Sequence, residues 1–226
     1  MTSTTLANIE KNFIFEVTMV HSDTHERTRD VVLEMVTAML WHQDETELRI
    51  ADVCRATGLS SSVIYNHFGS RQGLVDAAYL SLYDQASTQM MCELRRASAD
   101  FETPAELYDY FRGELEDAER ASFWLGLRQM RLRVATAAVA RVGLRANFAA
   151  AQDRHLADLA HYIGDLQRRH LISDHLCPDE FARVFEGYVL SHTYNDIALN
   201  PSDAATWTST LWALLNPLHD NRAPLN

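Results

Sequence analysis

Glycine, proline and cysteine are scarce in this sequence. Its 226 residues include eight glycines and five prolines, too few for the many turns of a β-sandwich or a β-barrel. The three cysteines, Cys54, Cys92 and Cys177, are an odd number at wide spacing, so we expect reduced thiols that mostly fill the core and no disulfide framework. With 47% hydrophobic and 23% charged residues, the composition favours an all-α globular protein.

The sequence also lacks a long apolar run. No stretch approaches the roughly 20 residues that a transmembrane helix needs. The most apolar N-terminal stretch, residues 12–20, contains Glu16 and has no small-residue cleavage site of a secretory signal. We therefore expect a cytoplasmic protein without a membrane partner. The net charge of -11 repels nucleic acid at long range, so any DNA binding has to come from a local surface patch.

Patterns of catalytic and cofactor sites are missing as well. The sequence contains no HExxH zinc pattern, no glycine-rich phosphate loop and no recognisable pair of nucleophile and base. The catalytic alternative is an enzyme that uses His155, Asp158 or Tyr162 in a helical cavity. Because no spacing supports that chemistry, we expect no enzyme, no cofactor and no metal site.

A helical period begins near Thr28. The apolar residues that recur along one helix face are Val32, Met35, Val36, Met39 and Leu40. A short second helix follows and ends at Gly58, which is placed to adopt the left-handed conformation after the last turn. Ser60 or Ser61 then caps a third helix, which ends near His67 before a longer fourth helix. Two short helices joined by a glycine-containing turn are typical of a helix-turn-helix, although a corner of a helical core shows the same periodicity.

Individual residues around this turn follow a specific order between Val53 and Leu74. They are Gly58, Leu59, Ser60, Tyr65, His67, Phe68, Arg71 and Leu74. Their order and spacing resemble the DNA-binding motif of the TetR family of transcriptional regulators. The resemblance implies the fold of that family for residues 28–80. Beyond residue 80 it depends only on chain length and helical character.

Small polar side chains at the start of a recognition helix let its backbone approach a major groove. Ser60, Ser61 and Ser62 fit that need, with helix capping as the alternative role. Val63 suits contact with a thymine methyl group, and Asn66 suits a bidentate pair with adenine. We expect these five residues to read bases or to seat the helix in the groove.

Further residues of the motif suit contacts to phosphate. They are Tyr65, His67 and Arg71. The resemblance implies that these residues contact the DNA backbone, while a core aromatic is the alternative for Tyr65. Arg49 stands where the family usually has threonine and offers another phosphate contact. Residues 53–75 contain two arginines and no acid, so this face can be locally positive although residues 27–77 carry five arginines against seven acids, a net of -2.

The chain divides into three parts. Residues 1–26 form an N-terminal extension, residues 27–75 the helix-turn-helix DNA-binding domain, and residues 76–226 a larger helical domain for effector binding and dimerisation. The fourth helix runs past Leu74 without a linker. Motions of the larger domain can therefore reach the motif through one rigid element.

The larger domain holds the candidates for an effector pocket. Residues 120–135 are too apolar and aromatic for a surface, and a long helix expected over residues 136–169 has one apolar stripe. The candidate lining residues are Met91, Phe111, Trp124, Leu127, Phe148, His155, Tyr162 and Tyr188. For each of them, an ordinary core position is the alternative.

Five arginines follow one another without an acid between residues 128 and 145. They are Arg128, Arg131, Arg133, Arg141 and Arg145. Such a run is typical of a solvated face that pairs with acids elsewhere. Recognition of an anionic ligand is the alternative.

The last two expected helices open at Pro178 and Pro201, and each carries an apolar stripe. Two such stripes, duplicated by a two-fold axis, form a four-helix interface, and TetR-like proteins dimerise in this way. The candidate interface residues are Phe181, Phe185, Tyr188, His192, Trp207, Leu211, Leu214 and Leu215. The alternative is that both helices close a monomeric core.

Together these features predict a ligand-responsive DNA-binding transcriptional regulator that acts as a homodimer. We expect a repressor that a small apolar or amphipathic effector releases from a near-palindromic operator in double-stranded DNA. The alternative is a helical ligand-binding or partner-binding protein whose helix-turn-helix no longer binds DNA.

Overall fold

The computed structural model describes residues 24–200 and 202–215, and this part of the chain is helical throughout, without a β-strand. The helices are α2 (Thr24–His42), α3 (Ile50–Thr57), α4 (Ser61–Phe68), α5 (Arg71–Ser98), α6 (Pro104–Glu116), α7 (Ala118–Ala140), α8 (Val142–Arg168), α9 (Pro178–Asp196) and α10 (Ala204–Leu215). The all-α prediction is confirmed. Most of the proposed N-terminal extension, residues 1–23, lies outside the described residues.

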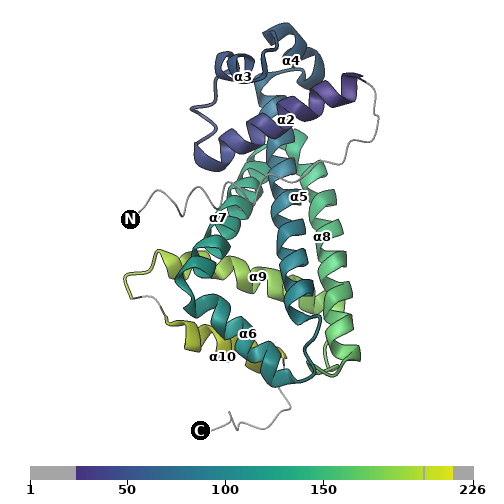
Figure 1. Ribbon diagram of the computed structural model, residues 1–226, viewed down its shortest axis with the longest axis vertical. Helices are drawn as coiled ribbons and strands as arrows, with labels where there is room; N and C mark the ends of the chain where they lie inside the picture. The colour runs from purple at the N-terminus through teal and green to yellow at the C-terminus, as the bar shows by residue number, and fades with distance from the viewer. Residues whose placement is uncertain (1–23, 201, 216–226) are drawn as a thin grey trace.

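Helices α2, α3 and α4 form one end of the molecule, and α6, α9 and α10 form the other (Figure 1). Helix α5 leaves the first group and runs along α7 and α8 toward the second. It is 28 residues long and has no break, as the missing linker after Leu74 predicted. None of the helices in the described part is both long enough and apolar enough to cross a membrane.

The turn between α3 and α4 has the local structure that the sequence predicts. Gly58 has a φ of 71°, in the left-handed region, and its N–H donates to the Cys54 carbonyl to close the last turn of α3. A side chain with a Cβ would be strained at that φ. Ser60 caps α4 by accepting a hydrogen bond from the Val63 N–H at 3.4 Å, and Ser70 caps α5 in the same manner. These caps fix where the recognition helix begins.

The helix expected over residues 136–169 is interrupted, which corrects that prediction. Helix α7 ends at Ala140 and α8 starts at Val142, because Arg141 between them adopts an extended conformation with φ −120° and ψ 109°. The Arg141 side chain pairs with Glu45 and with Asp76, at 2.8 Å in the second case. The residues that pair with Arg141 at this break are distant in the sequence. The periodicity of the local sequence therefore does not reveal the break.

Two clusters of buried side chains form the core, and α5 contributes to both. The cluster nearer the helix-turn-helix contains Val32, Val53, Ile64, Tyr79, Val134 and Leu144, among others. Helices α2 to α4 thus share apolar contacts with α7 and α8 as well as with α5. The second cluster lies among α5 to α10 and is rich in leucine and phenylalanine. Helix α5 therefore forms a continuous packed connection between the two clusters.

The cysteines are free, as the sequence predicts. Cys92 and Cys177 are exposed and Cys54 is only half-buried, so the expectation that cysteines mostly fill the core is wrong. On α5, the buried positions near Cys92 are occupied by Met91 and Leu94.

Candidate DNA-binding helix and effector pocket

One face of α4 carries exposed polar side chains. Ser61, Ser62 and Asn66 are exposed, and Tyr65 is 41% exposed. Residues three and four positions apart share a helix face, so the two serines lie one turn before Tyr65 and Asn66. Ile64 points the other way and is fully buried in the core. The helix is thus fixed to the protein on one side and free to enter a groove on the other.

The remaining motif residues differ in exposure. Val63 and His67 are half-buried, and Ser60 uses its hydroxyl to cap the helix. Arg49 is exposed immediately before α3 and makes no capping bond. The ring of Phe68 is half-buried and lies 5.5 Å below the guanidinium carbon of Arg29.

Arg71 has an internal role that the sequence did not indicate. Its Nε donates to the Leu48 carbonyl at 2.9 Å, and a terminal N–H donates to the Glu45 carbonyl. Arg71 therefore fastens the start of α5 to the loop between α2 and α3. Only its remaining N–H groups are available to a phosphate. The main role of Arg71 in this structure is therefore to hold the loop before α3 against the start of α5.

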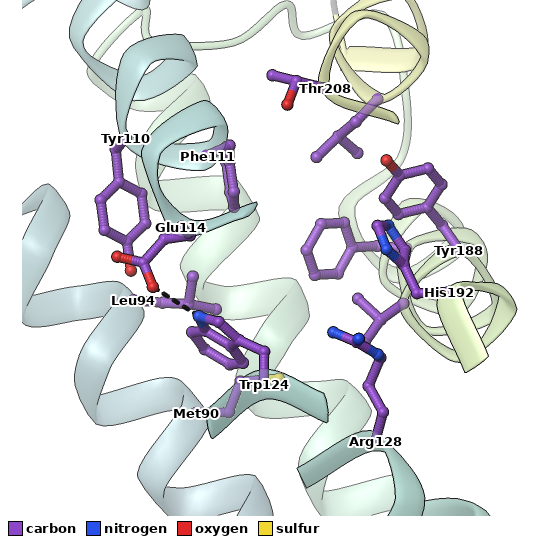
Figure 2. A pocket seen from close by; sticks show the side chains of 13 residues that line it. Met90, Leu94, Tyr110, Phe111, Glu114, Trp124, Arg128, Tyr188, His192 and Thr208 are labelled. Carbon is purple, nitrogen blue, oxygen red and sulfur yellow. Dashed lines mark hydrogen bonds between the residues drawn. The ribbon is translucent and has the colours of Figure 1, made fainter. Parts of the chain in front are cut away.

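At the far end of the larger domain, a cavity of about 80 Å³ lies among α5, α6, α7, α9 and α10 (Figure 2). Its lining is mainly aromatic and aliphatic. The lining residues are Met90, Leu94, Tyr110, Phe111, Glu114, Trp124, Arg128, Phe185, Tyr188, Val189, His192, Thr208 and Leu211. Concave, largely apolar sites with a few polar groups are typical of small-molecule binding.

The predicted pocket residues divide into two groups. Phe111, Trp124 and Tyr188 line the cavity. Met91, Leu127, Phe148, His155 and Tyr162 do not line this cavity. The stripe on α8 that suggested the last three is indeed largely buried, but it packs against α5. For example, the Tyr162 hydroxyl lies 3.1 Å from the Ser98 hydroxyl and the Phe148 ring packs edge-on against Tyr83.

Several polar groups of the pocket are already paired within the chain. The indole N–H of Trp124 donates to Glu114 at 2.6 Å, as the dashed line in Figure 2 shows. The Tyr188 hydroxyl donates to the Trp207 carbonyl at 2.6 Å, and burial raises the pKa of that hydroxyl. Arg128 pairs with Asp196 at 3.0 Å. Without these partners, burying such groups would cost folding free energy.

His192 is a buried titratable group of this pocket. Burial first, and the charge of Arg128 second, lower its pKa from 6.5 to about 4, against an opposite effect of Asp196. The imidazole is therefore neutral at physiological pH. It packs on Trp207, with ring centroids 4.0 Å apart, and edge-on against Tyr188.

The arginine run pairs with acids elsewhere, as expected, but it does not form a solvated face, because of the five arginines only Arg145 is exposed. Arg128 and Arg131 are buried, and Arg131 pairs with Glu186 on α9, a residue that the sequence did not single out. Arg133 donates to the Leu40 carbonyl at 2.7 Å. As described above, Arg141 pairs with two acids. Acids and carbonyls from other helices meet these arginines, and no local pattern predicts those partners.

The residues predicted for a dimer interface differ in exposure. Phe181, Phe185, His192 and Leu211 are buried within the chain. Tyr188 and Trp207 are half-buried and face each other, with ring centroids 5.3 Å apart. The side chains of Leu214 and Leu215 lie outside the described residues. Within the chain, the two apolar stripes cover the pocket and α6.

The opposite side of α9 is apolar and exposed. Val184, Tyr194 and Ile197 are 52%, 72% and 76% exposed, and Gly187 is exposed between the first two. The sequence could have revealed this side, because Val184, Gly187 and Tyr194 recur at helical spacing. The apolar stripe on the inner face of α9 is larger and dominates the pattern of the sequence.

The scan against protein-family models found no match. Among curated proteins, residues of this chain are 44% identical over 57 positions to the HTH-type transcriptional regulator AlkX of Mycobacterium tuberculosis. That match covers 25% of this chain and 27% of AlkX, so the chain spans about a quarter of this relative.

Solved structures match most of the chain. The TetR-family transcriptional regulator from Cytophaga hutchinsonii has a TM-score of 0.61 at 16% identity and covers 87% of this chain and 96% of its own. A Rhodococcus protein assigned to the TetR family has a TM-score of 0.59 at 20% identity, with 84% and 100% covered. A regulator from Saccharomonospora viridis in complex with choline has a TM-score of 0.55 at 16% identity, with 82% and 94% covered. The likenesses confirm the TetR fold, with an N-terminal helix-turn-helix and a helical C-terminal domain.

Proposed function

We propose that this protein, which has the TetR fold, is a DNA-binding transcriptional regulator whose helical domain binds a small molecule. The observation that carries the proposal is the exposed face of α4, where Ser61, Ser62, Tyr65 and Asn66 lie opposite the buried Ile64. A short helix of this kind reads bases from the major groove with its first turns. The partial likeness to AlkX, an HTH-type transcriptional regulator, supports the same role.

Effector binding and DNA binding are coupled in this proposal through α5. The cavity is about 80 Å³, well below the roughly 300 Å³ and more of typical ligand pockets, so a ligand has to move the helices around it. Met90 and Leu94 of α5 line the cavity, and the other end of α5 packs against α2 and α4. A ligand of this kind favours a conformation in which the helices around the cavity lie further apart. If that conformation binds DNA less tightly, the ligand lowers DNA affinity by the same factor by which DNA lowers ligand affinity. The protein then acts as a repressor.

Selection of duplex DNA from a random pool by the purified protein tests the DNA-binding proposal. We expect a near-palindromic site whose half-sites lie about 10 base pairs apart or a multiple of that spacing. The enrichment should weaken with rising salt, because phosphate contacts release counterions. If no site is enriched even at low salt, the alternative of a helical ligand-binding protein with a DNA-inactive motif is the better one.

We further propose that a homodimer forms through the outer side of α9. Val184, Tyr194 and Ile197 expose apolar surface there, which is costly to leave in water and is typical of an interaction site. One recognition helix contacts too few base pairs to be specific, so a second copy related by a two-fold axis is required on DNA.

Replacing Tyr194 by aspartate should therefore weaken dimerisation by about a hundredfold, because burying an unpaired carboxylate at an interface is strongly unfavourable. Analytical ultracentrifugation over a concentration series measures the change. The matched control is Val139→Asp, since Val139 of α7 is 73% exposed away from α9. Dimerisation that is unchanged in Tyr194→Asp but lost in Val139→Asp would place the interface on α7 instead.

A further inference from the structure

One wall of the pocket presents polar groups that the protein itself leaves unsatisfied. His192 of α9 is 7% exposed, and no hydrogen bond from the described residues reaches its ring nitrogens. Arg128 of α7 is also 7% exposed, and its Nε has no acceptor among the described residues although another nitrogen pairs with Asp196. In Figure 2 the Arg128 guanidinium points from α7 toward His192. Arg128 Nε is thus a buried donor without an acceptor, and the His192 ring on the same wall makes no hydrogen bond to the described residues.

Unsatisfied buried donors are expensive, and native structures rarely keep them without a reason. An acceptor supplied by a bound molecule would satisfy both. The neutral His192 offers one N–H, and Arg128 offers the N–H of Nε. An oxygen atom of a ligand between these side chains can accept both hydrogen bonds.

The opposite wall determines the rest of the ligand. Tyr110, Phe111 and Trp124 lie across the pocket from His192, with Met90 and Leu94 between them and α5 (Figure 2). The polar atoms of this wall do not need a hydrogen bond from the ligand. Trp124 already donates to Glu114, and Tyr110 already has a partner within the protein. Ring faces and edges of this kind pack well against an aromatic body.

The charges around the pocket argue against an ionic ligand. Glu114 and Asp196 are carboxylates, and Arg128 is already paired with one of them. A ligand carboxylate would add a third negative charge to a buried site with a single described guanidinium. A cationic head would meet the Arg128 guanidinium on one wall, and the Glu114 carboxylate on the opposite wall already accepts from the Trp124 N–H. The wall formed by Arg128 and His192 therefore favours an uncharged acceptor.

From these observations, and resting on the proposed effector role of the pocket, we infer that the ligand is an uncharged aromatic molecule with a hydrogen-bond-accepting oxygen, such as a ketone, held at Arg128 and His192. The aromatic body lies against Phe111 and Trp124. This assigns a chemical class to the effector and gives His192 the role of a specificity residue.

Four probes of similar size separate the possibilities when each is titrated into the full-length protein by calorimetry. Acetophenone has the accepting oxygen, ethylbenzene lacks it, benzoate is anionic and phenyltrimethylammonium is cationic. We expect acetophenone to bind at least about tenfold more tightly than either ion, given the cost of burying a charge without a new partner. Equal or tighter binding of benzoate or of phenyltrimethylammonium would overturn the inference, as would no binding of acetophenone.

The variant His192→Phe tests the donor wall while it keeps the ring shape. It should weaken acetophenone binding about tenfold and change ethylbenzene binding by less than about twofold, because only the ketone loses a hydrogen bond. His161→Phe, at an exposed position of α8, is the matched control and should alter neither. Equal effects of His192→Phe on both probes would contradict the inference.

Arg128→Met provides a second measurement if His192→Phe does not fold, as judged by circular dichroism. Its Asp196 partner is 27% exposed, so water can solvate the carboxylate that the variant leaves behind. The same selective loss of acetophenone binding is expected, and loss of both probes alike would count against the role of the donor wall. None of these titrations contains DNA, so their failure is distinguishable from failure of the DNA selection.

Discussion

Replacing Arg131 by methionine is expected to lower the free energy of unfolding at pH 7 by about 3 to 5 kcal/mol. Arg131 of α7 and Glu186 of α9 form an ion pair whose side chains are 3% and 8% exposed. His155 Nε2 lies 3.5 Å from the other Glu186 oxygen, and the Arg131 guanidinium carbon lies 5.4 Å from the ring centroid of Tyr83. The substitution would leave the carboxylate buried among these groups without its cation.

The free energy of unfolding of this variant can be measured by urea denaturation. Arg96→Met is the matched control, since Arg96 is exposed on α5 and its loss should change stability by less than about 0.5 kcal/mol. The double variant Arg131→Met with Glu186→Leu should recover most of the loss, because apolar side chains of similar size often replace a buried ion pair without penalty. A small effect of Arg131→Met alone would mean that water reaches Glu186 in the folded protein.

The same pair makes stability depend on pH. Burial by itself would raise the pKa of Glu186, but the proximity of His155 and the charge of Arg131 outweigh it and hold that pKa below the usual value of 4.5. A carboxyl group with a lowered pKa in the folded state stabilises the protein above pH 4.5, and this contribution is lost as the pH falls through the folded-state pKa. The stability difference between the wild type and Arg131→Met should therefore shrink in acid.

Replacing Asn66 by alanine is expected to weaken binding to the selected operator by about tenfold per half-site, and by roughly a hundredfold for a dimer on two half-sites. Asn66 is exposed on α4, so the variant removes no contact of the core. A bidentate pair with adenine is worth about 1 to 3 kcal/mol against the wrong base, so specificity at that position should relax as well.

Fluorescence anisotropy on the selected duplex, and on duplexes with each substitution at the adenine position, measures both effects. Asn200→Ala is the control, since Asn200 is exposed in the loop between α9 and α10, at the other end of the molecule. Tyr65→Phe should instead weaken all duplexes alike, because a phosphate contact carries no base information. If Asn66→Ala weakens every duplex to the same degree, its role is positioning and not base reading.

Local chemistry made the helix-turn-helix predictable. Gly58 has to follow α3 because the turn needs a positive φ, and Ser60 has to precede α4 because the first N–H groups of a helix need acceptors. These requirements involve residues only a few positions apart, so the sequence alone predicts them. The buried Ile64 and the exposed Tyr65 and Asn66 follow from the period of the same short helix.

The sequence by itself therefore determined the helical class, the turn, the caps and the side of α4 that faces outward. Only the tertiary structure decided which face of α9 looks inward, which aromatic residues surround the cavity and which acids meet the arginines. Arg131 and Glu186 are 55 positions apart, and Arg141 and Glu45 are 96 positions apart. Such partners are brought together by packing of whole helices, and periodicity within one helix carries no information about which neighbour its apolar side will meet.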